Sequence, residues 1–266
     1  MTDWRLGTMG FAYKDWKGPF YPANLEGDDY LSYYGRVFNA VEIDSTFYGA
    51  PRPETVRRWA AVTPEGFRFC AKLPRVITHE LKLSGAAGLL DEFTGVMRLL
   101  GDKLGMLLIQ LPPSFTLEQL SKLAAFAAVL PQDLRFAVEF RHRSWYTAEP
   151  EVYRLLEEHG VCWAATEYPD LPVRILPVRK SLYIRWIGQH GAFQRHDRER
   201  IDRSRSLERW WSGLQRAAGD LELVYGFFNN DYAGFAPATL NRFKELAGLP
   251  IEGADLPRQL DFLGDL

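Results

Sequence analysis

Cysteine, histidine and long apolar runs are scarce in this sequence. Its 266 residues include two cysteines, Cys70 and Cys162, and five histidines. Two distant cysteines form neither a disulfide framework nor a zinc ribbon. No segment approaches the roughly 18 uninterrupted apolar residues of a membrane span, and the first residues lack the basic and apolar parts of a signal peptide. We therefore expect a cytoplasmic protein with no membrane partner.

An excess of charge of either sign is also absent. Lys and Arg number 32 against 34 Asp and Glu, which gives a formal net charge of −2. Because no overall field attracts nucleic acid, any such binding has to be local. No repeat, linker or shift in composition divides the chain. Its length suits one α/β barrel, which commonly has roughly 250 residues, so we predict a single domain over residues 1–266.

Residues 136–145 give the strongest structural signal. A short apolar run there ends in a carboxylate, arginines and a histidine. Alternate side chains of a strand share a face, so Phe136, Val138 and Phe140 would lie on one side. The other side would pass from small residues to the charged Glu139 and Arg141. A strand buried on both faces with charge at its end is typical of a parallel α/β barrel.

The same pattern of an apolar run with a polar end recurs along the chain. The strand candidates are residues 4–8, 40–44, 67–72, 105–110, 136–140, 161–166, 181–185 and 223–229. Helical patterns separate most of them, one of which opens with a capping box at Thr116 and Gln119. Three prolines between residues 166 and 181 leave little room for a helix. We predict a (β/α)8 TIM barrel whose sixth helix is missing or vestigial, with residues 251–266 packed across its outside or bottom.

Active sites of TIM barrels form at the C-terminal strand ends, and charged and amide side chains gather at those positions here. Glu42 and Glu139 are the candidate acid/base pair, because two carboxylates in different environments can divide the two roles. Lys72 is the third catalytic candidate. The alternative is a set of ion pairs that only fills the barrel, for example between Glu139 and Arg141.

The other candidates would bind a substrate. Arginines suit an anionic group, amides suit hydroxyls or carbonyls, and aromatic faces stack on sugars or bases. The substrate-binding candidates are Arg141, Arg185, Gln110, Asn229, Asn230, Tyr13, Trp16, Tyr48 and Trp145. Most aromatic residues of the first loop could instead pack as a small second core. The arginine-rich segment 190–205 is interpreted either as a lid or phosphate clamp or as a solvated loop.

Metal binding has weaker support. Asp44, His79 and Asp231 could supply ligands, but the five histidines include no closely spaced pair. The cofactor is therefore unknown, and a divalent metal is not favoured.

Several motifs together resemble a known family. They are Gly10, Tyr13, Trp16, Gly18 and Phe20-Tyr21-Pro22, Val41-Glu42, Thr46-Phe47-Tyr48, Ile77-Thr78-His79, Gln110-Leu111-Pro112-Pro113, Val138-Glu139-Phe140-Arg141-His142 with Ser144-Trp145, and Phe228-Asn229-Asn230. The chain resembles, over nearly its whole length, the YecE-like family of bacterial TIM-barrel proteins, a domain of unknown function. The resemblance implies the barrel and no particular activity.

Three positions depart from the family pattern. Asp44 stands where the family usually has Asn, and Asp231 stands where His is common. After the seventh strand the expected His is absent, unless His190 substitutes for it. Any site that requires those imidazoles is therefore in doubt.

Three functions remain open from the sequence. The first is an enzyme, an acid/base isomerase or hydrolase acting on a small polar, anionic, sugar-like substrate. The second is a nucleic-acid-binding or repair protein that resembles endonuclease-type TIM barrels. The third is a non-catalytic protein that binds a metabolite. The enzyme hypothesis predicts that the charged side chains at the strand ends meet in one solvent-open pocket.

Overall fold

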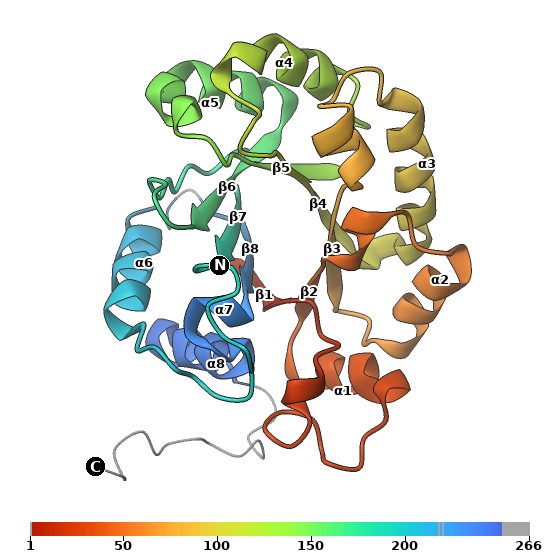
Figure 1. The fold of residues 1–266 in the computed structure, drawn as a ribbon, viewed down its shortest axis with the longest axis vertical. Helices are drawn as coiled ribbons and strands as arrows, with labels where there is room; N and C mark the ends of the chain where they lie inside the picture. Colours follow the sequence, from red (N-terminus) through yellow and green to blue (C-terminus); the bar gives the residue numbers. More distant parts are fainter. Residues whose placement is uncertain (1, 218, 220, 252–266) are drawn as a thin grey trace.

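The strands form a closed barrel in the computed structural model, which describes residues 2–217, 219 and 221–251. All neighbouring strands are parallel and follow chain order, and the last pairs with the first. Figure 1 shows the barrel surrounded by helices. The strands are β1 (Asp3–Met9), β2 (Ala40–Ile43), β3 (Arg68–Lys72), β4 (Leu104–Gln110), β5 (Arg135–Glu139), β6 (Val161–Glu167), β7 (Ser181–Trp186) and β8 (Leu223–Phe228). The predicted TIM barrel is confirmed.

Helices follow most strands, as predicted. The α-helices are α1 (Tyr30–Val37), α2 (Pro53–Val62), α3 (Ala87–Met97), α4 (Leu120–Ala128), α5 (Glu149–His159), α6 (Ser204–Ala217), α7 (Asn230–Ala233) and α8 (Ala236–Ala247). Residues 168–180, between β6 and β7, contain no helix, and Figure 1 shows the open sector between α5 and α6. The missing sixth helix is thereby confirmed. The prediction for the tail after residue 251 lies outside the described residues.

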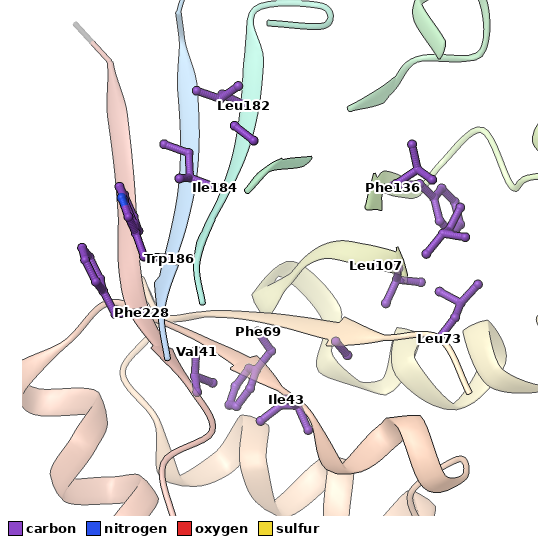
Figure 2. Close-up of a cluster of buried hydrophobic side chains, with 14 of the residues drawn as sticks. Val41, Ile43, Phe69, Leu73, Leu107, Phe136, Leu182, Ile184, Trp186 and Phe228 are labelled. Carbon is purple, nitrogen blue, oxygen red and sulfur yellow. The ribbon is translucent and has the colours of Figure 1, made fainter. Parts of the chain in front are cut away.

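The predicted faces of β5 are also confirmed. Phe136 and Val138 pack in the apolar layer between barrel and helices, whereas Ala137 belongs to the barrel interior. Figure 2 shows part of the outer layer, in which Trp186 and Phe228 stack with ring centroids 4.1 Å apart.

The interior of the barrel is filled with side chains below its mouth. Met106, Leu108, Tyr225 and Phe227 are buried there. Both cysteines are buried and free. The polar side chains at the C-terminal strand ends therefore rest on an apolar floor and not above a pore.

The aromatic residues of the long loop after β1 pack together, but they join the apolar layer between barrel and helices and do not form the separate second core that the sequence allowed. Trp16 is fully buried among Phe20, Tyr21 and Phe235. Tyr21 stacks on Tyr30 of α1 at 4.1 Å. This packing uses aromatic area that would otherwise be exposed beside the barrel mouth.

Among the described residues, no helix combines the length and the apolar character needed to cross a membrane.

The capping box before α4 gives a first testable prediction. The side chain of Thr116 accepts from the third residue of the 3-10 turn Leu117–Gln119, and the Thr116 amide donates to Gln119 Oε1 at 3.2 Å. Thr116→Ala is expected to lower the free energy of unfolding by about 1 kcal/mol. Urea denaturation measures it, with Thr116→Ser, which keeps the hydroxyl, as the control. Equal losses in both variants would contradict a capping role.

Candidate active site at the barrel mouth

Three charged side chains from separate strands meet at the centre of the mouth. Glu42 comes from β2, Glu139 from β5 and Arg185 from β7, and their side chains are 0%, 0% and 2% exposed. Arg185 Nε donates to Glu42 Oε2 at 2.9 Å and Nη2 donates to Oε1 at 2.7 Å. Its Nη1 donates to Glu139 Oε2. One guanidinium thus joins two carboxylates from different strands.

The two carboxylates differ in their remaining partners. Arg141 Nε donates to Glu139 Oε1, and the Arg141 guanidinium lies over the ring of Tyr168 at 4.1 Å. The phenol of Tyr183 donates to Glu42 Oε2 at 2.6 Å. Glu139 therefore has two cationic partners. Glu42 has one, the arginine that it shares with Glu139, and it also accepts a hydrogen bond from a neutral hydroxyl.

This asymmetry separates the pKa values of the two carboxyls. Burial acts to raise the pKa of Glu139, but Arg141 and Arg185 outweigh it and bring the pKa to about 2. Burial raises the pKa of Glu42, the Asp44 charge adds to that, and Arg185 opposes it only partly. The pKa of Glu139 is thus held below that of Glu42, so Glu42 is the more readily protonated of the two.

A second layer of charge covers the buried one. Lys72 Nζ lies 2.9 Å from Asp44 Oδ1, and Arg185 Nη2 lies 3.9 Å from the same oxygen. The side chains of Lys72, Asp44 and Arg141 are 14%, 33% and 11% exposed. The mouth therefore changes from fully buried charges inside to accessible charges at the rim.

The charged side chains at the strand ends converge, but not in the solvent-open pocket that the enzyme hypothesis predicts. Closed ion pairs are what the alternative, a set of charges that only fills the barrel, predicts. Glu42, Glu139 and Arg185 are enclosed by their own ion pairs and do not line an open pocket. The charged side chains at the ends of these strands point into the barrel and form ion pairs with one another at hydrogen-bond distance.

The amide candidates occupy different environments. Asn229 lies at the mouth, where its Nδ2 approaches Met9 Sδ at 3.5 Å and its Oδ1 accepts from the Asp231 amide at 2.8 Å. Asn230 is buried, and its Oδ1 accepts from Trp16 Nε1 at 3.2 Å. Gln110 ends β4 in register with Glu139 and is half-buried. Asn229 and Gln110 keep access to solvent, whereas Asn230 holds the first loop.

The aromatic candidates divide in the same way. Trp145 is fully buried, donates its indole N–H to Phe115 O at 2.8 Å and stacks on Phe140. Trp16 is equally buried, so neither tryptophan has surface to offer a ligand in this structure. Tyr48 is 87% exposed. Tyr13 is half-buried and donates its hydroxyl to the Met9 carbonyl at 2.6 Å.

The weak metal candidates lie in separate environments. Asp44 pairs with Lys72, and His79 Nδ1 lies 2.8 Å from Thr78 Oγ1. Burial lowers the pKa of His79, and Arg75 and Lys72 lower it further. In the described part of the chain, no group of three or more His, Cys, Asp and Glu side chains is arranged to hold a metal ion.

Asp231 is the centre of a contact that the sequence revealed only in part. His196 Nε2 lies 3.3 Å from its Oδ1, and His190 Nδ1 lies 3.5 Å from its Oδ2. The sequence offers His190 as a substitute for the absent family histidine, but it gives no signal for His196. Tyr183 was also missed, although it lies two residues before Arg185 and therefore shares its face.

Several arginines of the 190–205 segment are already engaged within the protein. Arg195 and Arg200 both pair with Asp197. Arg203 Nε donates to the Tyr232 carbonyl at 2.6 Å, and its guanidinium lies 4.8 Å from the Tyr232 ring centroid. These contacts weaken the interpretation of the segment as a free phosphate clamp.

Comparison with known proteins identifies the family. The profile of the family described as "Protein of unknown function DUF72" matches residues 5–260. The chain belongs to the DUF72 family. The membership of a YecE-like family that the sequence motifs predicted is confirmed.

Two curated relatives come from different bacteria. The UPF0759 protein YecE of Escherichia coli (strain K12) is 37% identical over 134 residues, a match that spans 49% of this chain and 49% of that protein. The UPF0759 protein YunF of Bacillus subtilis (strain 168) is 25% identical over 284 residues, covering 96% of this chain and 98% of YunF.

Solved DUF72 structures share the fold. A crystal structure of a DUF72 family protein from Thermotoga maritima MSB8 matches with a TM-score of 0.78 and 29% identity, covering 92% of this chain and 99% of that one. One from Enterococcus faecalis V583 matches with a TM-score of 0.75 and 21% identity, covering 94% and 99%. The barrel is therefore the fold of the family, whose description states no activity.

Proposed function

We propose that this DUF72 protein is an enzyme that binds a small, polar, anionic, sugar-like substrate at the barrel mouth. Glu42 and Glu139 form its acid/base pair. Lys72 and Arg141 bind the anionic group, and Asn229 and Gln110 hydrogen-bond hydroxyls or carbonyls. Cytoplasmic location remains part of this proposal, since two free, buried cysteines suit a reducing compartment.

The unequal surroundings of the two buried carboxylates carry the proposal. Glu139 accepts hydrogen bonds from two guanidinium groups. Glu42 accepts hydrogen bonds from the guanidinium that it shares with Glu139 and from a phenol hydroxyl. A purely structural plug does not require two carboxylates with different surroundings, and well-packed apolar side chains often stabilise a core as well as buried ion pairs do. Carboxyls whose pKa values are pushed apart suit proton transfer, in which one donates and the other stays ionised.

Access to Glu42 depends on the ion pair above it. Lys72 and Asp44 cover the buried layer and keep part of their surface exposed. A substrate anion would compete with Asp44 for Lys72 Nζ and thereby open a path to the carboxyls below. Lys72 then acts both as an anion contact and as the group that stabilises negative charge developing on the substrate. An isomerase or a hydrolase fits this arrangement.

Arg185 has a positioning role in this proposal. It is 2% exposed and its donors already engage Glu42 and Glu139, so it holds the carboxyls in place from below. Of the substrate-binding candidates, Tyr13 and Tyr48 retain accessible surface and remain proposed stacking contacts.

Anion binding tests the proposal directly. Calorimetric titration with glucose 6-phosphate, gluconate and neutral glucose is expected to show binding of at least one of the anions and weaker binding of glucose. Lys72→Met is expected to lower the affinity for the bound anion by about tenfold to a hundredfold, because it removes a hydrogen bond from a charged donor. Lys122→Met removes an exposed lysine of α4 and should leave the affinity unchanged.

Turnover separates the enzyme from a non-catalytic metabolite-binding protein. If Lys72-dependent binding occurs and products form, Glu42→Gln should abolish product formation while the anion still binds. Binding of the anions without turnover would favour the metabolite-binding alternative. If the parent protein binds none of the anions, the proposed substrate class is wrong.

Nucleic-acid binding or repair is the weaker alternative. Arg195, Arg200 and Arg203 are engaged in contacts within the protein, and the net charge is −2. Binding of an oligonucleotide that weakens steeply with rising salt would revive it.

A further inference from the structure

A hollow of about 630 Å³ lies outside the barrel wall, against α6. Val173 and Ile175 of the β6–β7 connection form one side, and Gly213 and Ala217 of α6 form the other. This is the sector in which the sixth helix is missing, between α5 and α6 in Figure 1. The irregular connection covers the wall only in part, so the absent helix leaves a cavity of the size that binds small molecules.

The hollow is separate from the barrel mouth. Glu167, the last residue of β6, contributes to its lining. Along β6, Ala164 belongs to the barrel interior and Ala165 to the outer layer. Strand alternation therefore directs Glu167 outward, and its carboxylate contacts Ser206 and Trp210 of α6.

The apolar part of the lining depends on a glycine. A methyl group on Gly213 would come within 2.7 Å of Ile175 Cδ1, so the glycine lets the connection approach the helix closely. Ile175, Val173 and Ala217 then present an apolar surface around this point. A ligand with an apolar body would bury that surface, which favours binding by about 25 cal/mol per Å² of apolar area removed from water.

The charge in the hollow is positive. Glu167 accepts from the Ser206 hydroxyl at 2.8 Å, from the Trp210 indole and from the Tyr232 hydroxyl at 2.9 Å, so donors from the protein already satisfy it. Arg209 and Arg216 lie seven residues apart on the same face of α6 and line the hollow.

Neither arginine is compensated by an acidic side chain. Both are exposed, and within residues 2–217, 219 and 221–251 neither takes part in an ion pair. Arg216 Nη2 lies 3.7 Å from the position of a methyl group on Gly213, so its guanidinium reaches over the apolar part of the lining. Two free guanidinium groups beside an apolar surface suit an anion with an apolar body.

We propose that this hollow is a second binding site, which takes a small organic anion with an aromatic or acyl body. The anionic group lies between Arg209 and Arg216. The body packs against Ile175, Val173 and Gly213. This site is independent of the proposed chemistry at the barrel mouth.

A matched pair of dyes tests both halves of the proposal. The probes are 8-anilinonaphthalene-1-sulfonate and N-phenyl-1-naphthylamine, which have the same aromatic body with and without the sulfonate. Fluorescence titration of the full chain is expected to show one saturable sulfonate site. The uncharged dye is expected to bind there at least about tenfold more weakly, because it lacks the contact with the arginines.

Substitutions assign the binding to the hollow. Arg209→Gln with Arg216→Gln should weaken binding of the sulfonate dye at least about tenfold. Ala217→Phe, which occupies part of the hollow, should weaken it as well. Arg36→Gln with Arg52→Gln is the control, because it removes the same charge from exposed positions outside α6. It should change the affinity by less than about twofold.

The test of the hollow remains decisive even if one variant folds poorly. The glutamine pair replaces exposed side chains and carries the test if Ala217→Phe fails to fold. Equal dye affinity in the parent protein and in the glutamine pair would overturn the proposal, as would a parent protein without a saturable site. An equal loss in the charge-matched control would show that net charge and not the hollow governs binding.

Discussion

Replacing Arg185 with methionine is expected to lower the free energy of unfolding by about 3–5 kcal/mol at neutral pH. Arg185 is the only cationic side chain in hydrogen-bond contact with Glu42 among the described residues, and it also donates to Glu139. Both carboxylates are fully buried. Methionine fills a similar volume but leaves Glu42 without a charged partner at hydrogen-bond distance, and burying an uncompensated charge is costly. Urea denaturation measures the loss.

Two companion variants make the origin of that loss explicit. Arg141→Met removes one partner of Glu139 but leaves Arg185 in place, so its cost should be smaller. Adding Glu42→Gln to Arg185→Met removes the unpaired carboxylate and should recover part of the loss, a coupling that a double-mutant cycle detects. A loss below about 1 kcal/mol for Arg185→Met, the range of an exposed pair, would mean that water reaches these carboxylates.

The barrel was predictable because its strands repeat one simple pattern. In β5 the alternation of Phe136 and Val138 with Ala137 gave the correct faces. The prolines between β6 and β7 gave the missing helix. By contrast, α1 was not predicted. Its eight residues include three tyrosines and a glycine, which are weak helix formers, and its stability comes from aromatic packing with the first loop.

The charged centre was predictable only in part. Alternation places Glu42, Glu139 and Arg185 on inward faces, but it gives neither their depth nor which charges pair. That information depends on the register between strands and on distant elements, since Arg185 follows Glu42 by 143 positions. Residues in loops and short turns lack even the alternation. Trp145 therefore turns into the core and His196 reaches Asp231 without a sequence signal for either.

At pH 7, Glu139→Gln is expected to cost about 3 kcal/mol and Glu42→Gln considerably less. Lowering the pKa of Glu139 from its ordinary 4.5 to about 2 corresponds to about 3 kcal/mol of stability. Glutamine loses this contribution because it presents no charge to Arg141 and Arg185. The pKa of Glu42 moves in the opposite direction. Burial opposes the ionised form of Glu42, and the uncharged glutamine removes that cost.

The two groups also act on stability in opposite pH ranges. The contribution of Glu139 is complete above the ordinary carboxyl pKa of 4.5 and is lost as the pH falls toward about 2. The contribution of Glu42 is present below that ordinary pKa and is lost as the pH rises through its raised value. Glu139→Gln should therefore weaken the acid-side fall in stability, and Glu42→Gln should weaken the fall on the other side.

Urea denaturation of the parent protein and both variants between about pH 2 and about pH 8 measures these profiles. Glu92→Gln, which replaces an exposed carboxylate in the middle of α3, controls for the general effect of removing one negative charge. Equal losses of stability in both mouth variants at pH 7, with parallel dependence of the free energy of unfolding on pH, would mean that the pKa values of the two carboxyls do not differ. The separation of roles between Glu42 and Glu139 would then fail, and with it the acid/base chemistry proposed for the barrel mouth.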